Sequence, residues 1–466
     1  MTLQDSAAHP LAGPAQDAAA PSFPGLAPAL AEFAAMPAAE MPESARAILR
    51  LSLLDWAAVA LAGAEEPVAR LVRADALRDG GTAEAGVLGS AVRLPARAAA
   101  LVNGTVSHAL DYDDTHFLHV GHPSVAVLPA VLALAEAERL PGSAVIPAAL
   151  VGVEASCRVG AWLGRAHYNA GFHQTATAGA FGAVLASCRL LGLDAGATGM
   201  ALGIATTRVS GLKSQFGTMG KPLNAGLAAS NGVEAARLAG AGFVSAPDAL
   251  EGPQGFGETH AQGGVEAAEA LDGVGREWVF ETVSHKFHAC CHGLHAMLEA
   301  LGALQAEEPV EPGQVASLTV LTNPRWLKVC NIERPTTGLE AKFSYRLTAA
   351  MALAGRDTGA LETYTDAVCT DPALTALGDR VRVETDPDIA DTAARVTLRL
   401  ANGRERAASH DLALPEPLTA RVAKLDAKAD ALLGAGPAAA LKERVSRLET
   451  MTDPVTLAWL LNGQAD

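Results

Sequence analysis

The stretch His108-Ala-Leu-Asp-Tyr-Asp-Asp-Thr-His-Phe-Leu-His-Val-Gly-His-Pro-Ser124 holds four histidines and three aspartates in one short segment. Apolar runs flank it, Ala98-Ala-Ala-Leu-Val before and Val125-Ala-Val-Leu-Pro-Ala-Val-Leu after, and their spacing suits buried helices. The polar segment is therefore expected to be carried into or against an apolar interior. Polar side chains held there must be hydrogen-bonded or take part in chemistry.

The composition predicts a mainly helical protein. The chain has 466 residues, of which 50% are hydrophobic and only 4% aromatic. This length predicts two or three domains. Alanine dominates the apolar residues, and its small side chain lets helices pack closely. The fold class predicted is mainly α, with a large all-helical domain and a smaller α+β domain.

Charge and cysteine usage limit the partners and the compartment. The formal net charge of −16 argues against binding to nucleic acid or to an anionic membrane surface, which require a basic face. A negatively charged small substrate is compatible with it if local lysines and histidines override the overall field. Six cysteines without a Cys-x-x-Cys unit predict free thiols in a reducing cytoplasm. The N-terminus lacks a signal-peptide pattern, and charged or glycine residues break the apolar runs before the ~20 residues of a membrane span.

The domain limits follow from changes in periodicity along the chain. Residues 1–24 are rich in Ala, Pro and Gly and are predicted to be a flexible tail. Helical patterns dominate 25–275, the predicted helical domain, and strand-like alternation begins beyond residue 312 in the predicted α+β lid domain, 276–414. Two alternatives stay open for the helical stretch 415–466: it completes the lid domain or returns to the helical domain.

Individual elements can be placed within these domains. Ser44 is a plausible N-cap and Gly63 a plausible stop for one core helix. Gly179 and Gly182, at helical spacing, would let another backbone approach. Further helices are predicted over 95–109, 123–138 and 143–164, and strands over 315–322, 380–385 and 394–400, with a hairpin-like turn at 401–404.

Candidate cationic and proton-handling side chains lie outside regular charged helix faces. His173 and Thr175 stand at the start of a predicted helix, where free amide groups favour an anion. Lys221 and Lys286 lie in loops rich in Gly or His, which favours anion binding over a purely solvated role. Asp111, Asp113, Thr115 and His122 include a candidate general acid/base set, in which some members would only hold the loop by local hydrogen bonds.

Three other kinds of chemistry fit the sequence less well. The clustered histidines lack the spacing of a familiar metal site, such as His-Glu-x-x-His. Cys290 and Cys291 have histidines nearby, but a buried inert cysteine is commoner than a nucleophile. The glycines around Gly217 do not form a phosphate-binding loop, which argues against nucleotide cofactors.

Six ordered motifs resemble those of the MmgE/PrpD family, over roughly residues 27–460. The segment His108-Ala-Leu-Asp-Tyr-Asp-Asp-Thr115 with Gly121-His-Pro-Ser124 is similar to the family's first motif. The others are Gly171-Phe-His-Gln-Thr-Ala-Thr177, Phe216-Gly-Thr-Met-Gly-Lys-Pro222, Leu250-Glu-Gly252, Lys286 with Cys290-Cys291, and Glu340-Ala-Lys-Phe-Ser344.

The resemblance implies a fold and a site. The fold would be a helical domain joined to an α+β lid domain, as a homodimer, with a site between the domains that needs no metal and no cofactor. The matching active-site residues are Asp111, Thr115, His122, His173, Lys221 and Lys286. Many members carry Tyr at the position of Leu347, and Tyr345 beside it is included among the predicted substrate-binding residues.

The family includes 2-methylcitrate dehydratase, cis-aconitate decarboxylase and iminodisuccinate epimerase, whose reactions share proton removal next to a carboxylate. By resemblance, Lys221, Lys286 and His173 would bind carboxylates, His122 and Asp111 would transfer protons, and Thr115 would orient a substrate group.

The first hypothesis is a cofactor-independent hydro-lyase acting on a small di- or tricarboxylate of the methylcitrate type. The alternatives are an epimerase of an imino- or amino-dicarboxylate, a decarboxylase, and a non-catalytic carboxylate-binding protein. The decarboxylase branch has His where Cys291 aligns, and the seven-residue step from Thr115 to His122 is more similar to the epimerase and the broad bacterial branch.

Overall fold

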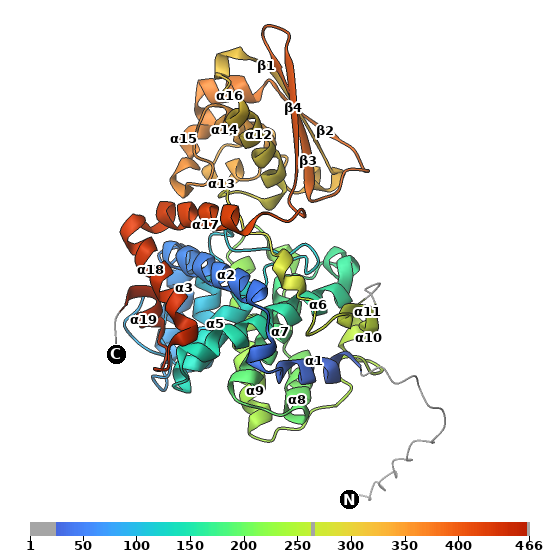
Figure 1. Cartoon of the computed structure of the whole chain (residues 1–466), viewed down its shortest axis with the longest axis vertical. Coiled ribbons are helices and arrows are strands. Elements are labelled where there is room, and N and C mark those ends of the chain that lie inside the picture. The colour runs from blue at the N-terminus through green and yellow to red at the C-terminus, as the bar shows by residue number, and fades with distance from the viewer. Residues whose placement is uncertain (1–24, 262–265, 464–466) are drawn as a thin grey trace, which may run out of the picture.

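A computed structural model of the chain describes residues 25–261 and 266–463, and it has a helical body below a smaller part that contains a sheet (Figure 1). The predicted tail, 1–24, lies outside the described residues. The body contains α1 (Leu26–Ala34), α2 (Glu43–Ala62), α3 (Pro67–Asp79), α4 (Ala96–Ser107), α5 (Ser124–Ala137), α6 (Val145–Ala170), α7 (Gln174–Leu190), α8 (Ala195–Thr206), α9 (Gly220–Gly240), α10 (Phe256–His260) and α11 (Ala267–Leu271). The mainly helical fold with a smaller α+β part is confirmed.

Small residues allow the central helices to pack closely. A Cβ atom added at Gly182 of α7 would lie 2.3 Å from the carbonyl oxygen of Gly152 in α6, and one added at Gly179 would lie 2.7 Å from the Cβ of Ala126 in α5. Such distances leave no room for a side chain. The predicted backbone approach is confirmed at Gly182, whereas the neighbour at Gly179 is a side-chain atom. Between α4 and α9, a Cβ at Gly104 would lie 2.8 Å from the Cα of Gly226.

Helix α6 is long and apolar enough to cross a membrane by composition alone. Within the protein, however, 94% of the most apolar 18-residue stretch of this helix is buried. It passes through the middle of the helical body (Figure 1), which is the position of a core helix.

The smaller part carries a four-stranded mixed sheet. Its strands are β1 (Val315–Thr322), β2 (Val381–Thr385), β3 (Ala393–Leu400) and β4 (Glu405–Asp411), in the order β2-β1-β3-β4. Strand β1 pairs in parallel with β2 and antiparallel with β3, with Val320 opposite Val383 and Val396. The helices of this part are α12 (His295–Glu307), α13 (Gly338–Ala341), α14 (Tyr345–Leu353), α15 (Asp366–Thr370) and α16 (Pro372–Gly378).

The C-terminal helices return to the helical body. Helices α17 (Leu418–Leu433), α18 (Ala435–Arg447) and α19 (Leu457–Asn462) lie along α2 and its neighbours (Figure 1). Ala429, Leu441 and Leu457 belong to the same apolar cluster as the body helices, and this cluster also includes Phe280 and Val283, beyond residue 275. The limits 25–275, 276–414 and 415–466 themselves stay predictions.

Two local predictions need correction. Helix α2 begins at Glu43 with Pro42 as its N-cap, because the Ser44 hydroxyl donates to the Glu281 carboxylate at 2.8 Å instead of capping. Strand β4 was not predicted, since its sequence lacks clear apolar alternation. The predicted turn before it, at 401–404, is confirmed, because the Leu400 amide donates to the Arg404 carbonyl. The six cysteines are free thiols, as predicted.

Candidate active site

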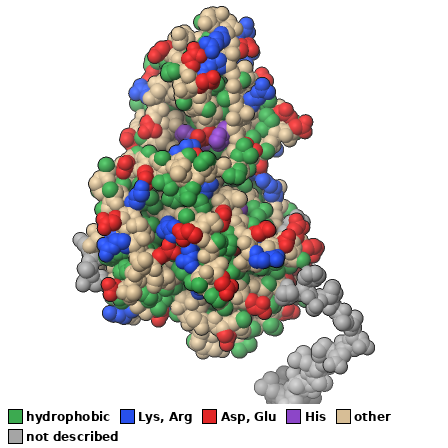
Figure 2. All heavy atoms as spheres, viewed as in Figure 1, with side chains coloured by type: hydrophobic (Ala, Val, Ile, Leu, Met, Phe, Trp, Pro, Cys, Tyr) green, Lys and Arg blue, Asp and Glu red, His purple; other side chains and the backbone are tan. Residues whose placement is uncertain are grey.

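A cavity of about 750 Å³ lies between the helical body and the smaller part, within the size range of small-molecule sites. Histidine side chains are visible in the notch between the two parts in Figure 2. We call the N-terminal side the helical wall, whose polar residues include Glu66, His108, Asp111, Thr115, His122 and Lys221. We call the other side the C-terminal wall, which contributes Lys286, Cys291, His292, Arg325 and Lys342.

The loop between α4 and α5 forms the centre of the helical wall. Asp111 has a φ of 51°, which is uncommon for a residue other than glycine and has to be held by its surroundings. The Lys286 ammonium donates to its carbonyl oxygen. The Tyr112 hydroxyl donates to the Gly359 carbonyl at 2.9 Å, and Lys428 donates to the Tyr112 carbonyl at 2.6 Å. The loop is thus fixed by residues from three later segments of the chain.

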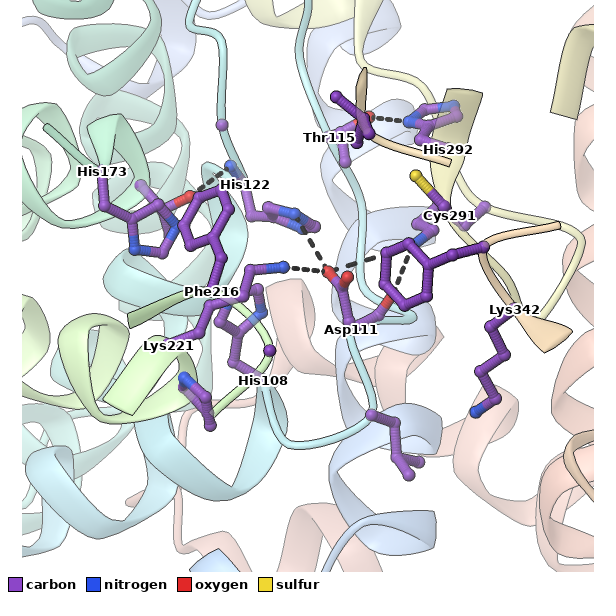
Figure 3. A pocket seen from close by; sticks show the side chains of 18 of the residues that line it. His108, Asp111, Thr115, His122, His173, Phe216, Lys221, Cys291, His292 and Lys342 are labelled. Atoms are coloured by element: carbon purple, nitrogen blue, oxygen red, sulfur yellow. Dashed lines mark hydrogen bonds and ion pairs between the residues drawn. The ribbon is translucent and has the colours of Figure 1, made fainter. Parts of the chain in front are cut away.

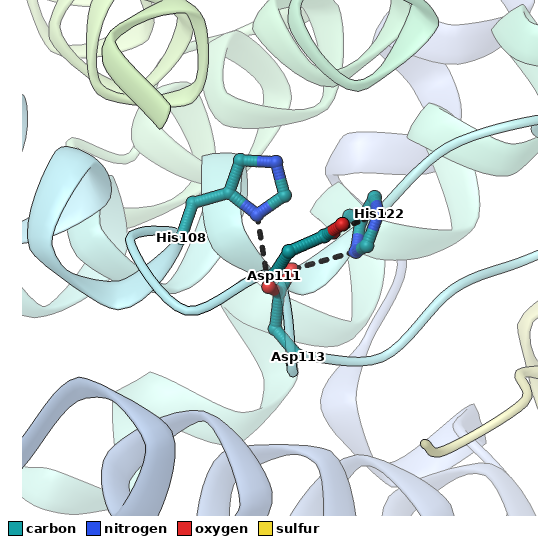
Figure 4. A group of neighbouring side chains, drawn as sticks. All are labelled: His108, Asp111, Asp113 and His122. Carbon is teal, nitrogen blue, oxygen red and sulfur yellow. Dashed lines mark hydrogen bonds and ion pairs between the residues drawn. The ribbon is translucent and has the colours of Figure 1, made fainter. Parts of the chain in front are cut away.

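Asp113 lies between two histidines at the buried base of this loop (Figure 4). One of its oxygens is 2.8 Å from Nδ1 of His108, and the other is 2.8 Å from Nδ1 of His122. Burial alone would raise the pKa of Asp113, but the two histidines hold it well below its usual range. An ionised Asp113 beside Nδ1 of His122 favours hydrogen on that nitrogen and orients the ring, so that Nε2 faces Asp111 on the cavity side.

Asp111 is surrounded by positive charge on the cavity side. Its Oδ1 atom lies 2.6 Å from Nζ of Lys221, 3.3 Å from Nε2 of His122 and 3.9 Å from Nζ of Lys286. Burial would raise the pKa of Asp111, but Lys221 and Lys286 keep it well below its usual range. A carboxylate that stays ionised is a poor proton donor, so this geometry favours an electrostatic role for Asp111 over the predicted proton transfer.

Thr115 joins the helical wall to the C-terminal wall. Its Oγ1 atom lies 2.6 Å from Nδ1 of His292, whose Nε2 is 3.3 Å from Oγ of Ser284. The backbones of Thr115 and Ser284 also exchange two hydrogen bonds of 2.8 Å. Burial and the nearby Lys286 lower the pKa of His292, so its imidazole is neutral near pH 7. His292 was not predicted as a site residue, although it directly follows the Cys290-Cys291 pair of a quoted motif.

His173 stands at the N-cap of α7 and faces the same cavity (Figure 3). The Asn224 amide nitrogen lies 3.2 Å from its Nδ1, and since that nitrogen donates, Nδ1 is the acceptor and Nε2 carries the hydrogen. Burial and Lys221 lower its pKa well below the usual value. His173 is therefore suited to bind an anion as a neutral hydrogen-bond donor and not as a cation.

The same helix start positions His122. The backbone amide of His122 donates to Oγ1 of Thr175 at 3.0 Å. Gly121 makes this approach feasible, because a Cβ atom there would lie 2.7 Å from the Thr175 amide nitrogen. The amino end of α7 thus orients the histidine of the neighbouring loop.

Other polar side chains of the 108–124 segment hold its shape. Nε2 of His116 lies 2.8 Å from the Val279 carbonyl, and Nδ1 of His119 lies 2.9 Å from the Ser156 carbonyl. Burial lowers the pKa of His116 to about 4 and that of His119 to about 3, so both are neutral near pH 7. Asp114 accepts hydrogen bonds from the amide and hydroxyl of Ser124, the first residue of α5.

A metal ion is the alternative occupant of the densest cluster. One ligand atom each from His108, Asp111, Asp113 and His122 lies within 4.8 Å of the others. The two carboxylates, however, already have partners within the protein: Asp113 lies between the two imidazoles, and Asp111 contacts the Lys221 ammonium. A lysine ammonium beside the carboxylate supplies the positive charge that a metal would bring, so the arrangement favours proton transfer and ion pairing.

The two neighbouring cysteines differ in their environments. Burial raises the pKa of Cys290 to about 12, which makes its thiol inert. Cys291 lines the cavity, and a hydrogen bond from Cys330 lowers the pKa of its thiol. A nucleophilic role can therefore fall only to Cys291 of this pair.

The structure does not bring Tyr345 to the cavity, and this corrects its predicted substrate contact. Tyr345 is fully buried at the start of α14, and its hydroxyl donates to the Gly293 carbonyl at 2.6 Å. Ser344 caps this helix, which turns the Tyr345 ring into the core of the smaller part. Asp111, Thr115, His122, His173, Lys221 and Lys286 all line the one cavity.

Comparison with known proteins gives two family matches and several curated relatives. The model of the MmgE/PrpD N-terminal domain matches residues 28–267, and that of the MmgE/PrpD C-terminal domain matches residues 288–449. A cis-aconitate decarboxylase of Aspergillus terreus is 36% identical over 236 residues, 48% of this chain and 48% of that protein. The human cis-aconitate decarboxylase is 29% identical over 309 residues, 64% of this chain and 63% of that protein. The matched region thus spans about half of the fungal relative and under two thirds of the human one.

Proposed function

The chain belongs to the MmgE/PrpD family, and from this premise we propose that it is a lyase that acts on a small di- or tricarboxylate by proton transfer next to a carboxylate. The observation that carries the proposal is the contact between Asp113 and His122, which prepares Nε2 of His122 as a base beside the ammonium groups of Lys221 and Lys286.

The proposed proton removal has a direct electrostatic rationale. His122 takes a proton from the carbon next to a substrate carboxylate, and the C–H electrons move into that carboxylate to give an enolate-like dianion. Lys221 and Lys286 stabilise this developing charge because their ammonium groups are already fixed near it before the reaction. The NH group at Nε2 of His173 donates a hydrogen bond to a substrate carboxylate oxygen.

Dehydration of a citrate-type hydroxy acid is the reaction that we put first. It needs a base for the carbon-bound proton and a separate donor for the departing hydroxide. The Thr115 hydroxyl, hydrogen-bonded to His292, stands on a different side of the cavity from His122 (Figure 3). This couple would donate a hydrogen bond to the departing hydroxyl group, which leaves as water together with the proton that His122 has taken up, and a double bond conjugated with the carboxylate remains.

Decarboxylation is the second candidate, since the fungal and human relatives compared above are both described as cis-aconitate decarboxylases. In that reaction the C–C bond to a carboxylate breaks, carbon dioxide leaves, and the electron pair takes up a proton from a protonated His122. The same lysines would stabilise the charge before protonation.

Proton NMR in deuterated water separates these reactions. The purified protein is mixed in turn with 2-methylcitrate, citrate and cis-aconitate. A rise in ultraviolet absorbance indicates dehydration, with a new vinylic signal from citrate or with a methyl signal on a double bond from 2-methylcitrate. A vinylic product with release of carbon dioxide indicates decarboxylation, and deuterium incorporation without net change indicates epimerisation. A protein that causes none of these changes in any di- or tricarboxylate, while the folded state is intact, would contradict the proposal.

The homodimer implied by the family stays a prediction. Light scattering on the purified chain, coupled to size exclusion, measures the mass directly. A mass of one chain at micromolar concentration would contradict it.

A further inference from the structure

The charges that line the cavity are unevenly distributed between its walls. Among the described residues, the lining carboxylates are Asp111 and Glu66, and both stand on the helical wall. In the part of the chain that the structure describes, the C-terminal wall has no lining carboxylate and three lining cations, Lys286, Arg325 and Lys342.

Two of these three cations have partners within the protein. Lys286 donates to the Asp111 carbonyl and lies 3.9 Å from its carboxylate. Arg325 pairs with Asp391, which also lies 2.7 Å from Arg165 of α6. Lys342 is different, since no carboxylate of the described residues lies within 4 Å of its ammonium group.

The position of Lys342 is fixed although its ammonium group forms no ion pair with the described residues. It is the C-cap residue of α13, and its carbonyl oxygen accepts a hydrogen bond of 2.9 Å from the Cys291 amide. The nearest aromatic ring, that of Tyr364, is centred 5.6 Å from Nζ. In Figure 3, Lys342 and Lys221 stand on opposite sides of Asp111. A half-buried lysine without a carboxylate partner is costly to the folded state, so a bound anion would relieve this cost.

We propose that Lys342 binds one carboxylate of the substrate and selects tricarboxylates over dicarboxylates. This inference rests on the proposed function, because it assigns a third carboxylate to the same cavity. Lys221 and Lys286 hold the carboxylates near His122, and Lys342 holds the one that faces the C-terminal wall. A ligand with only two carboxylates has one carboxylate fewer to place against the three ammonium groups, so it forms fewer charge-assisted hydrogen bonds.

Calorimetric titration with two unreactive probes tests the inference. The probes are tricarballylate, with three carboxylates, and glutarate, with two. The wild-type protein should bind tricarballylate at least about tenfold more tightly than glutarate, as expected for one additional charge-assisted contact. In Lys342→Met, tricarballylate binding should weaken about 10- to 100-fold, while glutarate binding should change less than about threefold.

Two further variants control for charge and for folding. Lys342→Arg keeps the positive charge and should keep most of the preference. Lys328→Met removes an exposed lysine of the same part of the chain and should leave both affinities unchanged. Circular dichroism verifies that each variant is folded.

The outcomes separate this inference from the proposed function. Equal weakening of both probes in Lys342→Met, or no change in either, would overturn the role of Lys342 while leaving a carboxylate site in place. If neither probe, nor cis-aconitate, binds the wild-type protein, the proposed function and this inference both fail.

Discussion

The two walls of the cavity handle charge in different ways. On the helical wall, charged groups are paired with each other, as in the contact of Asp113 with His108 and His122 or that of Asp111 with Lys221. On the C-terminal wall, Lys342 has no carboxylate partner among the described residues, and His292 has a pKa lowered mainly by burial. A paired set suits proton transfer, because its geometry is fixed in advance, whereas an unpaired cation suits anion binding.

The largest expected effect is on the helical wall, at His122. His122→Ala should lower kcat by roughly 10³- to 10⁴-fold, because it removes the proposed base, and the fold should remain intact. Rates are measured on the carboxylate identified by NMR, with and without added imidazole, which should restore part of the activity if proton transfer is what was lost. His410→Ala, on strand β4, serves as the control. A kcat of His122→Ala within tenfold of the wild-type value would contradict the role of His122 as the base.

The next largest loss of activity is expected at Lys286, the residue of the C-terminal wall that contacts Asp111 of the helical wall. Lys286→Met should lower kcat/KM by roughly 10²- to 10³-fold, since a buried cation near the developing negative charge would be missing. Lys328→Met is the matched control, because its lysine is exposed on the same part of the chain. If the loss in Lys286→Met is confined to thermal stability and kcat/KM is kept, Lys286 only holds the backbone of Asp111.

A smaller effect distinguishes two adjacent aspartates of the helical wall by the sign of their pH dependence. Because the folded-state pKa of Asp113 lies below the unfolded value, its contribution to stability is present above about pH 4 and is lost as the pH falls. In Asp113→Asn, the slope of the free energy of unfolding against pH below about pH 4 should be shallower by up to about 1.4 kcal/mol per pH unit.

Asp114 should show the opposite sign. Burial raises its pKa to about 6, so its contribution is present below about pH 4 and is lost as the pH rises through 6. Asp114→Asn should therefore flatten the pH dependence between about 4 and 6, where Asp113→Asn changes little. Urea unfolding at a series of pH values measures both slopes, and identical profiles for the two variants would contradict the assigned charge states.

The sequence was sufficient for the composition of the helical wall but not for its connections. Asp111, His122 and Lys221 of this wall were predicted from motifs, and all three line the cavity. The placement of Asp113 between two imidazoles depends on the positive φ of Asp111. An aspartate at a given position does not by itself predict a positive φ.

The C-terminal wall was predicted less well because its geometry depends on helix starts. Ser344 begins α14 by capping it, which buries Tyr345, and the short helix α13 ends at Lys342, which places that side chain on the cavity. Caps that differ by one residue change which side chains face a site, and sequence patterns locate helix ends only approximately.

The smallest effect tests whether the C-terminal wall really carries an unpaired charge. Burial and Lys286 lower the pKa of Lys342 below the value of an unfolded lysine, so its charged form is penalised in the folded state at neutral pH. Lys342→Met should therefore raise Tm by roughly 1–3 °C at pH 7. Since the penalty is relieved as the pH rises toward about 10, the difference between variant and wild type should narrow there. Thermal melts at pH 7 and pH 10 measure it. Tricarballylate at one fixed concentration should reverse the order at pH 7, because it binds the wild-type protein more tightly than Lys342→Met and therefore stabilises the wild type more. A variant less stable than wild type at pH 7 without ligand would show that Lys342 is already paired, and the contrast between the two walls would then fail.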